Sequence, residues 1–110
     1  MEAPTSNREL TAARSAASST RKSRIRFVGA LDAFTVRAAL ARIDSVIESD
    51  VREVIVDLAE LVHIDSYGVR ALSTLHKRVT AQGGKVLVVN CSDQPRMVLE
   101  LCGLRAALGL

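Results

Sequence analysis

The sequence VIVDLAELVHIDSYG, residues 54–68, joins two apolar runs to a polar corner. The β-branched run at 54–56 is typical of a strand that is buried on both faces. The second run, at 61–64, leads to Asp65-Ser66-Tyr67-Gly68, and apolar residues then recur at helical spacing. We therefore expect a buried strand, a loop and a serine in the first turn of a helix. Polar chemistry and anions collect at such a position, because the first N–H groups of a helix lack intrahelical partners.

Strand and helix patterns alternate along the chain. Apolar runs predict strands at 24–28, 51–58 and 85–89, and an amphipathic helical pattern follows each of them. Two further short strands are predicted at 10–13 and 104–110. This alternation predicts a single α/β domain with a mainly parallel sheet and right-handed crossovers.

Polar residues gather where the predicted strands end and the helices begin. The predicted helix caps are Asp32 or Thr35, Asp65 or Ser66, and Ser92 or Asp93. Asp57 stands close to the end of its strand. Because sites in parallel sheets form at the carboxyl ends of the strands, we expect the functional site at this edge.

The composition indicates one folded domain with an aliphatic core. The chain has 110 residues, of which 48% are hydrophobic and only 3% aromatic. So few aromatic rings argue against a stacking platform for single-stranded nucleic acid. Basic residues in the first quarter account for much of the net charge of +3, so we interpret residues 1–22 as a basic, flexible tail and residues 23–110 as the domain. Contact with nucleic acid or a membrane is the less favoured interpretation.

Cys91 and Cys102 form no C-x-x-C motif and no metal-ligand pattern with histidine. We therefore expect two reduced thiols in a cytoplasmic protein, with no metal ion. The apolar side of the third helix is predicted to consist of Met97, Val98, Leu101 and Cys102. We expect no transmembrane segment and no secretory signal, since the sequence has neither pattern.

Signals for catalysis are sparse. The nucleophile elbow, the P-loop and the dinucleotide-binding glycine motif are missing. A Ser66–His63 nucleophile–base pair and an Asp57–Asp65 carboxylate pair compete with simpler roles, a helix cap for Asp65 and a strand-end hydrogen bond for Asp57. The simpler roles are favoured, so we expect no catalytic residues. Ser66 also suits a switch, because phosphorylation would add about −1.5 to −2 charges to the first turn of a helix.

Five segments match a known family pattern in order and spacing. They are Gly29-Ala30-Leu31-Asp32, the strand at 54–58, Ile64-Asp65-Ser66-Tyr67-Gly68, the glycine and strand segment at 83–89, and the helix end at 99–104. Over residues 24–105 the chain resembles a STAS domain, and more narrowly a bacterial anti-sigma factor antagonist. The resemblance implies a sheet of four or five strands with helices on one side.

The resemblance implies a binding protein that is not an enzyme and needs no cofactor. Such antagonists capture an anti-sigma factor, which is also a serine/threonine kinase of the histidine-kinase-like ATPase type, and so free the sigma factor. The kinase phosphorylates a hydroxyl in the Asp-Ser-Ser/Thr-Gly motif and breaks the complex, and a phosphatase restores it. Partner contacts are expected at Asp32, Asp65, Ser66, Tyr67 and Gly68, with Ser66 as the candidate phosphorylation site and a monomer as the free form.

Tyr67 departs from the family pattern, since a second aliphatic hydroxyl is usual at its position. Ser66 is then the one aliphatic hydroxyl of the motif. Either Ser66 accepts the phosphate, or the domain binds without being switched and Tyr67 is a constitutive contact. The alternative function is an accessory or scaffold subunit of a lipid-transport ATPase or a signalling complex, in which STAS-like domains also serve.

Overall fold

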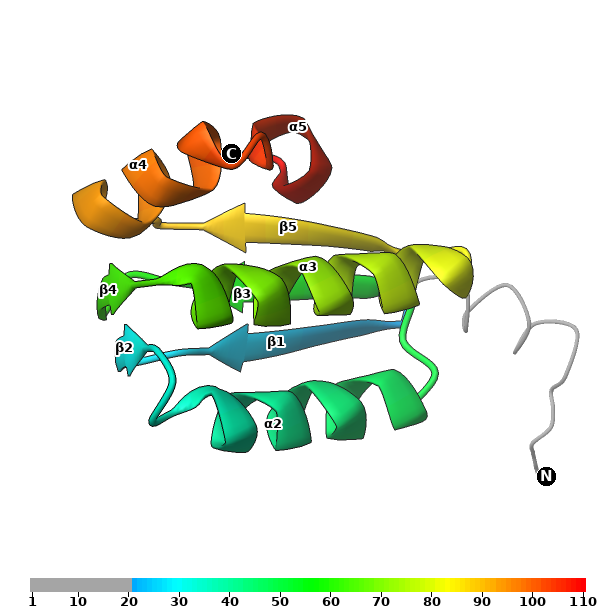
Figure 1. Cartoon of the computed structure of the whole chain (residues 1–110). Coiled ribbons are helices and arrows are strands. Elements are labelled where there is room, and N and C mark those ends of the chain that lie inside the picture. Colours follow the sequence, from blue (N-terminus) through cyan, green and yellow to red (C-terminus); the bar gives the residue numbers. More distant parts are fainter. Residues whose placement is uncertain (1–20) are drawn as a thin grey trace, which may run out of the picture.

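The computed structural model describes residues 21–110. Their elements are, in order, β1 (Lys22–Arg26), β2 (Gly29–Leu31), α2 (Val36–Glu48), β3 (Glu53–Asp57), β4 (Leu61–Ile64), α3 (Ser66–Ala81), β5 (Lys85–Val89), α4 (Asp93–Leu101) and α5 (Arg105–Leu108), as shown in Figure 1. The predicted strand at 10–13 and residues 1–20 of the predicted tail lie outside the described residues.

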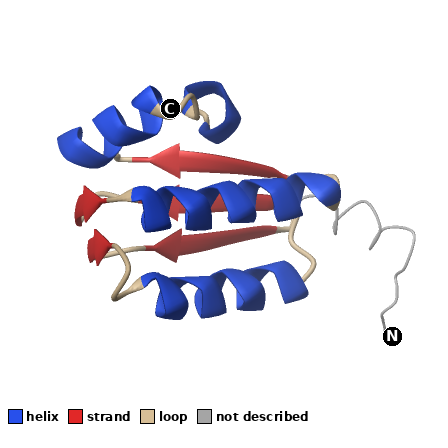
Figure 2. Cartoon of the chain, viewed as in Figure 1, coloured by secondary structure: helices blue, strands red, loops and turns tan. Residues whose placement is uncertain are grey.

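A parallel sheet forms the centre of the domain. β3 lies between β1 and β5, and Ile55 stands opposite Arg24 on one side and Leu87 on the other. β2 and β4 form a second parallel pair beyond the carboxyl ends of these strands (Figure 2). The predicted α/β domain with a mainly parallel sheet is therefore confirmed. The sequence pattern missed β2, because a strand of three residues is too short to show an alternation.

The helices α2 and α3 pack against each other, and α3 also packs against β5 and β4. Figure 1 shows α3 in front of the sheet. The amphipathic helical patterns predict one inward face for each helix, and this is confirmed by the burial of Ile43 in α2 and of Leu72 and Leu75 in α3. The core is almost wholly aliphatic, and Phe27 is the one aromatic residue among its described members. Since the apolar faces cover each other, the polar residues are left at the turns that connect strands to helices.

The predicted strand at 104–110 is wrong, because this segment contains the helix α5. The N–H of Leu108 donates to the carbonyl of Leu104 at 3.0 Å, and Leu108 is fully buried. Gly109 ends the helix in the left-handed region, with φ at +67°. Two leucines four residues apart with alanines between them favour a helical turn over a strand.

The predicted buried side of α4 is largely wrong. Met97 and Leu101 are 55% and 81% exposed, and Cys102 is exposed as well. Of the four predicted residues only Val98 packs against the core. The helix instead buries Pro95 and Leu99. The buried proline in its first turn sets the phase of the helix, so that Leu99, four residues later, follows it onto the inner face.

Candidate docking site

Asp65 caps the N-terminus of α3. Its Oδ1 atom accepts hydrogen bonds from the N–H groups of Tyr67 at 2.9 Å and Gly68 at 3.3 Å. These bonds satisfy two of the N–H groups that the start of a helix leaves without intrahelical partners. Of the two caps predicted here, Asp65 is therefore the one in use. Ser66 is the first residue of the helix and is exposed.

Gly68 lets the first turn of α3 approach β2 and β4 closely. A Cβ atom at this position would lie 2.6 Å from the carbonyl oxygen of Leu31 and 2.5 Å from Cγ1 of Ile64. Both distances are well inside the normal separation of nonbonded atoms, about 3.5–4.0 Å between carbons. Gly68 is buried, so its role in the site is to allow this close packing, and it presents no side chain to a partner.

Asp32 organises the turn that precedes α2. Its Oδ1 atom accepts hydrogen bonds from the N–H groups of Phe34 at 2.9 Å and Thr35 at 3.1 Å. Thr35 occupies the N-cap position of α2 but makes no side-chain capping bond, and the bonds to Asp32 hold the turn before the helix, so neither residue of the predicted pair caps α2 with its side chain. The N–H of Asp65 donates to the carbonyl of Leu31 at 3.2 Å, which joins this turn to the start of α3.

The predicted site residues are thus brought together at one corner of the domain. We use the name docking corner for Asp32, Asp65, Ser66, Tyr67 and Gly68. Its two aspartates hold the turns, its glycine provides the close packing, and Ser66 and Tyr67 are exposed. The corner therefore presents the aliphatic hydroxyl of Ser66 and the phenol ring of Tyr67 to a protein that approaches it.

Large apolar side chains are exposed around the docking corner. Phe34 is 95% exposed on the turn held by Asp32, Val62 is 69% exposed in β4, and Tyr67 is 50% exposed. The chain has only three aromatic residues, so two of them lie on this surface and only one lies in the core. Phe34 and Tyr67 thus offer apolar surface to a partner at the two turns of the corner. Phe34 was not among the predicted site residues.

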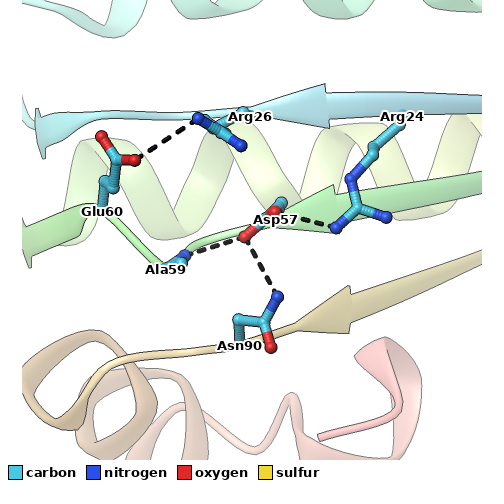
Figure 3. A network of polar contacts seen from close by, with 6 residues as sticks. All are labelled: Arg24, Arg26, Asp57, Ala59, Glu60 and Asn90. Carbon is cyan, nitrogen blue, oxygen red and sulfur yellow. Dashed lines mark hydrogen bonds and ion pairs between the residues drawn. The ribbon is translucent and has the colours of Figure 1, made fainter.

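Asp57 belongs to a separate polar network at the end of β3 (Figure 3). Its carboxylate accepts hydrogen bonds from the N–H of Ala59 at 3.0 Å, from Arg24 at 2.8 Å and from Asn90 at 3.5 Å. The bond from Ala59, followed by the bond from Arg24, lowers the pKa of Asp57 from 3.8 to about 2. Within residues 21–110 it shares no hydrogen-bond partner with Asp65, and it has the strand-end role that the sequence favours.

The Asp57 network should make stability depend on pH in the acid range. Because the pKa of Asp57 is lower in the folded state, its stabilising effect is complete above about 3.8 and is lost as the pH falls towards about 2. We expect Asp57→Asn to lower the urea midpoint of unfolding at neutral pH much more than near pH 2. The control is Asp44→Asn, which removes an exposed ion pair with Arg78 and should change little. An equal loss at both pH values would contradict the role of the charge.

A Ser66–His63 nucleophile–base pair is the catalytic alternative that the sequence offers at the docking corner. His63 is exposed in β4, and no hydrogen bond joins it to Ser66 in the part of the chain that the structure describes. Over the same residues, no three side chains of His, Cys, Asp or Glu gather in a group that could hold a metal ion. No helix in residues 21–110 has the length and apolar character needed to cross a membrane.

Comparison with solved structures finds similar proteins. The unphosphorylated form of the anti-sigma factor antagonist SpoIIAA is 28% identical, with a TM-score of 0.71 over 81% of this chain and 79% of that chain. The phosphorylated form of SpoIIAA, described as a Bacillus cell fate determinant, is also 28% identical, with a TM-score of 0.65 over 81% and 82%. An anti-sigma factor antagonist from Mycobacterium paratuberculosis, at 20% identity and a TM-score of 0.67 over 77% and 72%, shares the fold. Curated proteins give no match.

A family comparison covers the same part of the chain. The model of the STAS domain matches residues 16–108, a range that contains every strand and helix described above. The match thus includes both turns of the docking corner and the β-strands that position them. The protein therefore belongs to the STAS domain family.

Proposed function

We propose that this STAS domain is a cytoplasmic anti-sigma factor antagonist. It binds an anti-sigma factor of the serine/threonine kinase type through the docking corner, and Ser66 is the residue that the kinase phosphorylates. The likeness to SpoIIAA in its unphosphorylated and phosphorylated forms supports this assignment. The observation that carries the proposal is the exposed hydroxyl of Ser66 at the first position of α3, beside exposed aromatic rings.

Ser66 is the better acceptor of the two hydroxyl residues in the corner. A kinase that acts on serine or threonine requires an aliphatic hydroxyl, and the phenol of Tyr67 lies much farther from the backbone than the Oγ atom of a serine. Asp65 already occupies the N–H groups of Tyr67 and Gly68. The Ser66 hydroxyl is therefore not needed to cap the helix, and its modification would leave the cap in place.

Phosphorylation would change the docking corner mainly through its charge. Asp32 and Asp65 already place two carboxylates there. A phosphate on Ser66 would add about −1.5 to −2 charges to them. Because the Asp65 carboxylate already holds two of the N–H groups at the start of α3, these two cannot neutralise a phosphate, and much of the added charge faces the partner. The complex should weaken through like-charge repulsion and through the desolvation of the phosphate.

The exposed aromatic residues should supply much of the binding energy. We expect Tyr67→Ala to weaken binding of the anti-sigma factor about tenfold, in the range typical of an aromatic anchor at an interface. The unfolding midpoint should change little, because the ring is half exposed. Leu101→Ala in α4 removes an apolar side chain that is 81% exposed away from the corner and is the control. Calorimetry measures both, and equal affinities for the two variants would contradict docking at the corner.

The assignment is tested with an anti-sigma factor of the histidine-kinase-like ATPase fold from the same genome. The purified proteins are incubated with ATP, and the intact mass of this chain is measured. We expect the mass of one phosphate in the wild type and none in Ser66→Ala. A phosphate that persists in Ser66→Ala would move the site to another residue. The absence of both binding and phosphorylation for the wild type, with every kinase of this fold in that genome, would overturn the proposed function.

A further inference from the structure

The outer edge of β4 is bound by side chains from the start of α4. The Oε1 atom of Gln94 accepts a hydrogen bond from the N–H of Ile64 at 3.0 Å, and its Nε2 atom donates to the carbonyl of Ile64 at 3.2 Å. The hydroxyl of Ser92 donates to the carbonyl of Leu61. Ser92 is a predicted helix cap but makes no side-chain capping bond, and nothing in the sequence pattern distinguishes Gln94.

These side-chain hydrogen bonds take the place of the backbone hydrogen bonds that a neighbouring strand would make to this edge of β4. β4 pairs with β2 along one edge only, and its register skips Val62, so that Leu61 lies opposite Gly29 and His63 opposite Ala30. The other edge leaves buried backbone groups that would be costly without partners. A carboxamide carries both a donor and an acceptor, and so it can satisfy the N–H and the carbonyl of one residue together.

The residue held by Gln94 is the one that leads into the docking corner. Ile64 is 1% exposed and directly precedes Asp65, whose N–H donates to the carbonyl of Leu31. Gln94 therefore holds the backbone of Ile64, and the Leu31 carbonyl of β2 holds the backbone of Asp65, the next residue. Ile64 also packs beside Gly68, since its Cγ1 atom lies 2.5 Å from the place that a Cβ atom of residue 68 would take.

We infer that Gln94 is a positioning residue of the docking corner. By holding Ile64 from α4, it keeps Asp65 and the first turn of α3 in the geometry that a partner binds. A corner that is fixed before binding loses less conformational entropy in the complex, so this contact raises the affinity without touching the partner. The effect on affinity rests on the proposed function, whereas the effect on the corner of the free protein does not.

Amide hydrogen exchange of the free protein tests the positioning. In Gln94→Met, which keeps the size of the side chain but loses both hydrogen bonds, we expect the protection of the Ile64 amide to fall at least about tenfold. Protection at Asp65 and Tyr67 should fall with it, while the amides of β3 keep theirs. The matched control is Gln82→Met, the same change in a half-buried glutamine at the other end of α3. Equal exchange at the corner in the two variants would overturn the inference.

A second variant and a binding measurement complete the test. Gln94→Glu keeps the acceptor but loses the donor at neutral pH, so the protection of the Ile64 amide should fall below that of the wild type. This variant takes the place of Gln94→Met if Gln94→Met fails to fold. With the kinase-type anti-sigma factor as probe, Gln94→Met should bind about fivefold more weakly than Gln82→Met. Equal affinities would overturn the inference. If the wild type itself binds no such kinase, the proposed function fails, and the exchange result still decides whether Gln94 positions the corner.

Discussion

Replacing Gly68 with alanine is expected to destabilise the domain by about 2 kcal/mol. An alanine usually favours a helix over a glycine by about 1 kcal/mol, so helix propensity alone predicts the opposite sign. The added Cβ atom would lie 2.6 Å from the Leu31 carbonyl oxygen and 2.7 Å from its Cβ atom. Overpacking of this kind costs about 1–3 kcal/mol, and a contact with backbone belongs at the upper end, because backbone cannot rotate away. The clash therefore outweighs the gain in propensity.

Urea unfolding measures this effect, with Gly103→Ala as the control. Gly103 has φ at +76° and no atom within 4 Å of an added Cβ, so that substitution carries only the cost of the backbone conformation, about 1 kcal/mol. Gly68→Ala should also shift the backbone resonances of Leu31 and Asp65, which the control leaves unchanged. A Gly68→Ala protein as stable as the wild type would show that α3 can move away from β2 without cost. The close approach would then not be required.

The parts of the fold that depend on neighbours in sequence were predictable. Asp65 caps α3 because a carboxylate two and three residues before free N–H groups can reach them, and this is a local relation. The apolar spacing of α3 likewise identifies Leu72 and Leu75 as core residues. These signals were enough to place the docking corner at the carboxyl ends of the strands, where Asp32 and Asp65 meet.

The parts that depend on contacts across the fold were not predictable. Gln94 lies 30 residues from Ile64 in the sequence, and no local pattern distinguishes an amide that binds a strand edge from one that faces water. The phase of α4 depends on which side of Pro95 meets the core, so the stripe through Met97 was assigned to the wrong face. Phe34 was missed for a related reason, since exposure is a property of the assembled surface.

Ser66→Asp is expected to weaken binding of the anti-sigma factor about a hundredfold, equivalent to about 2.7 kcal/mol. The substitution places a third carboxylate beside Asp32 and Asp65 at the surface that meets the partner. The domain itself should stay folded, because Ser66 is exposed and an acidic residue is favourable in the first turn of a helix. Ser66→Ala removes the phosphate acceptor without adding charge, and should bind within about threefold of the wild type. The phosphorylated protein should bind at least as weakly as Ser66→Asp, since its charge is larger.

Ser45→Asp separates the effect of position from the effect of net charge. Ser45 is exposed in α2, away from the docking corner, so its substitution changes the charge of the protein equally but should leave the affinity nearly unchanged. Calorimetry at two salt concentrations also tests whether charge repulsion causes the loss of affinity. A repulsion between exposed charges weakens as salt is added, so the loss in Ser66→Asp should be smaller at the higher concentration. Equal affinities of Ser66→Asp and Ser45→Asp would show that the corner tolerates a charge, and the domain would then bind without a switch. A loss in Ser66→Ala as large as in Ser66→Asp would instead make the hydroxyl of Ser66 a direct contact with the partner.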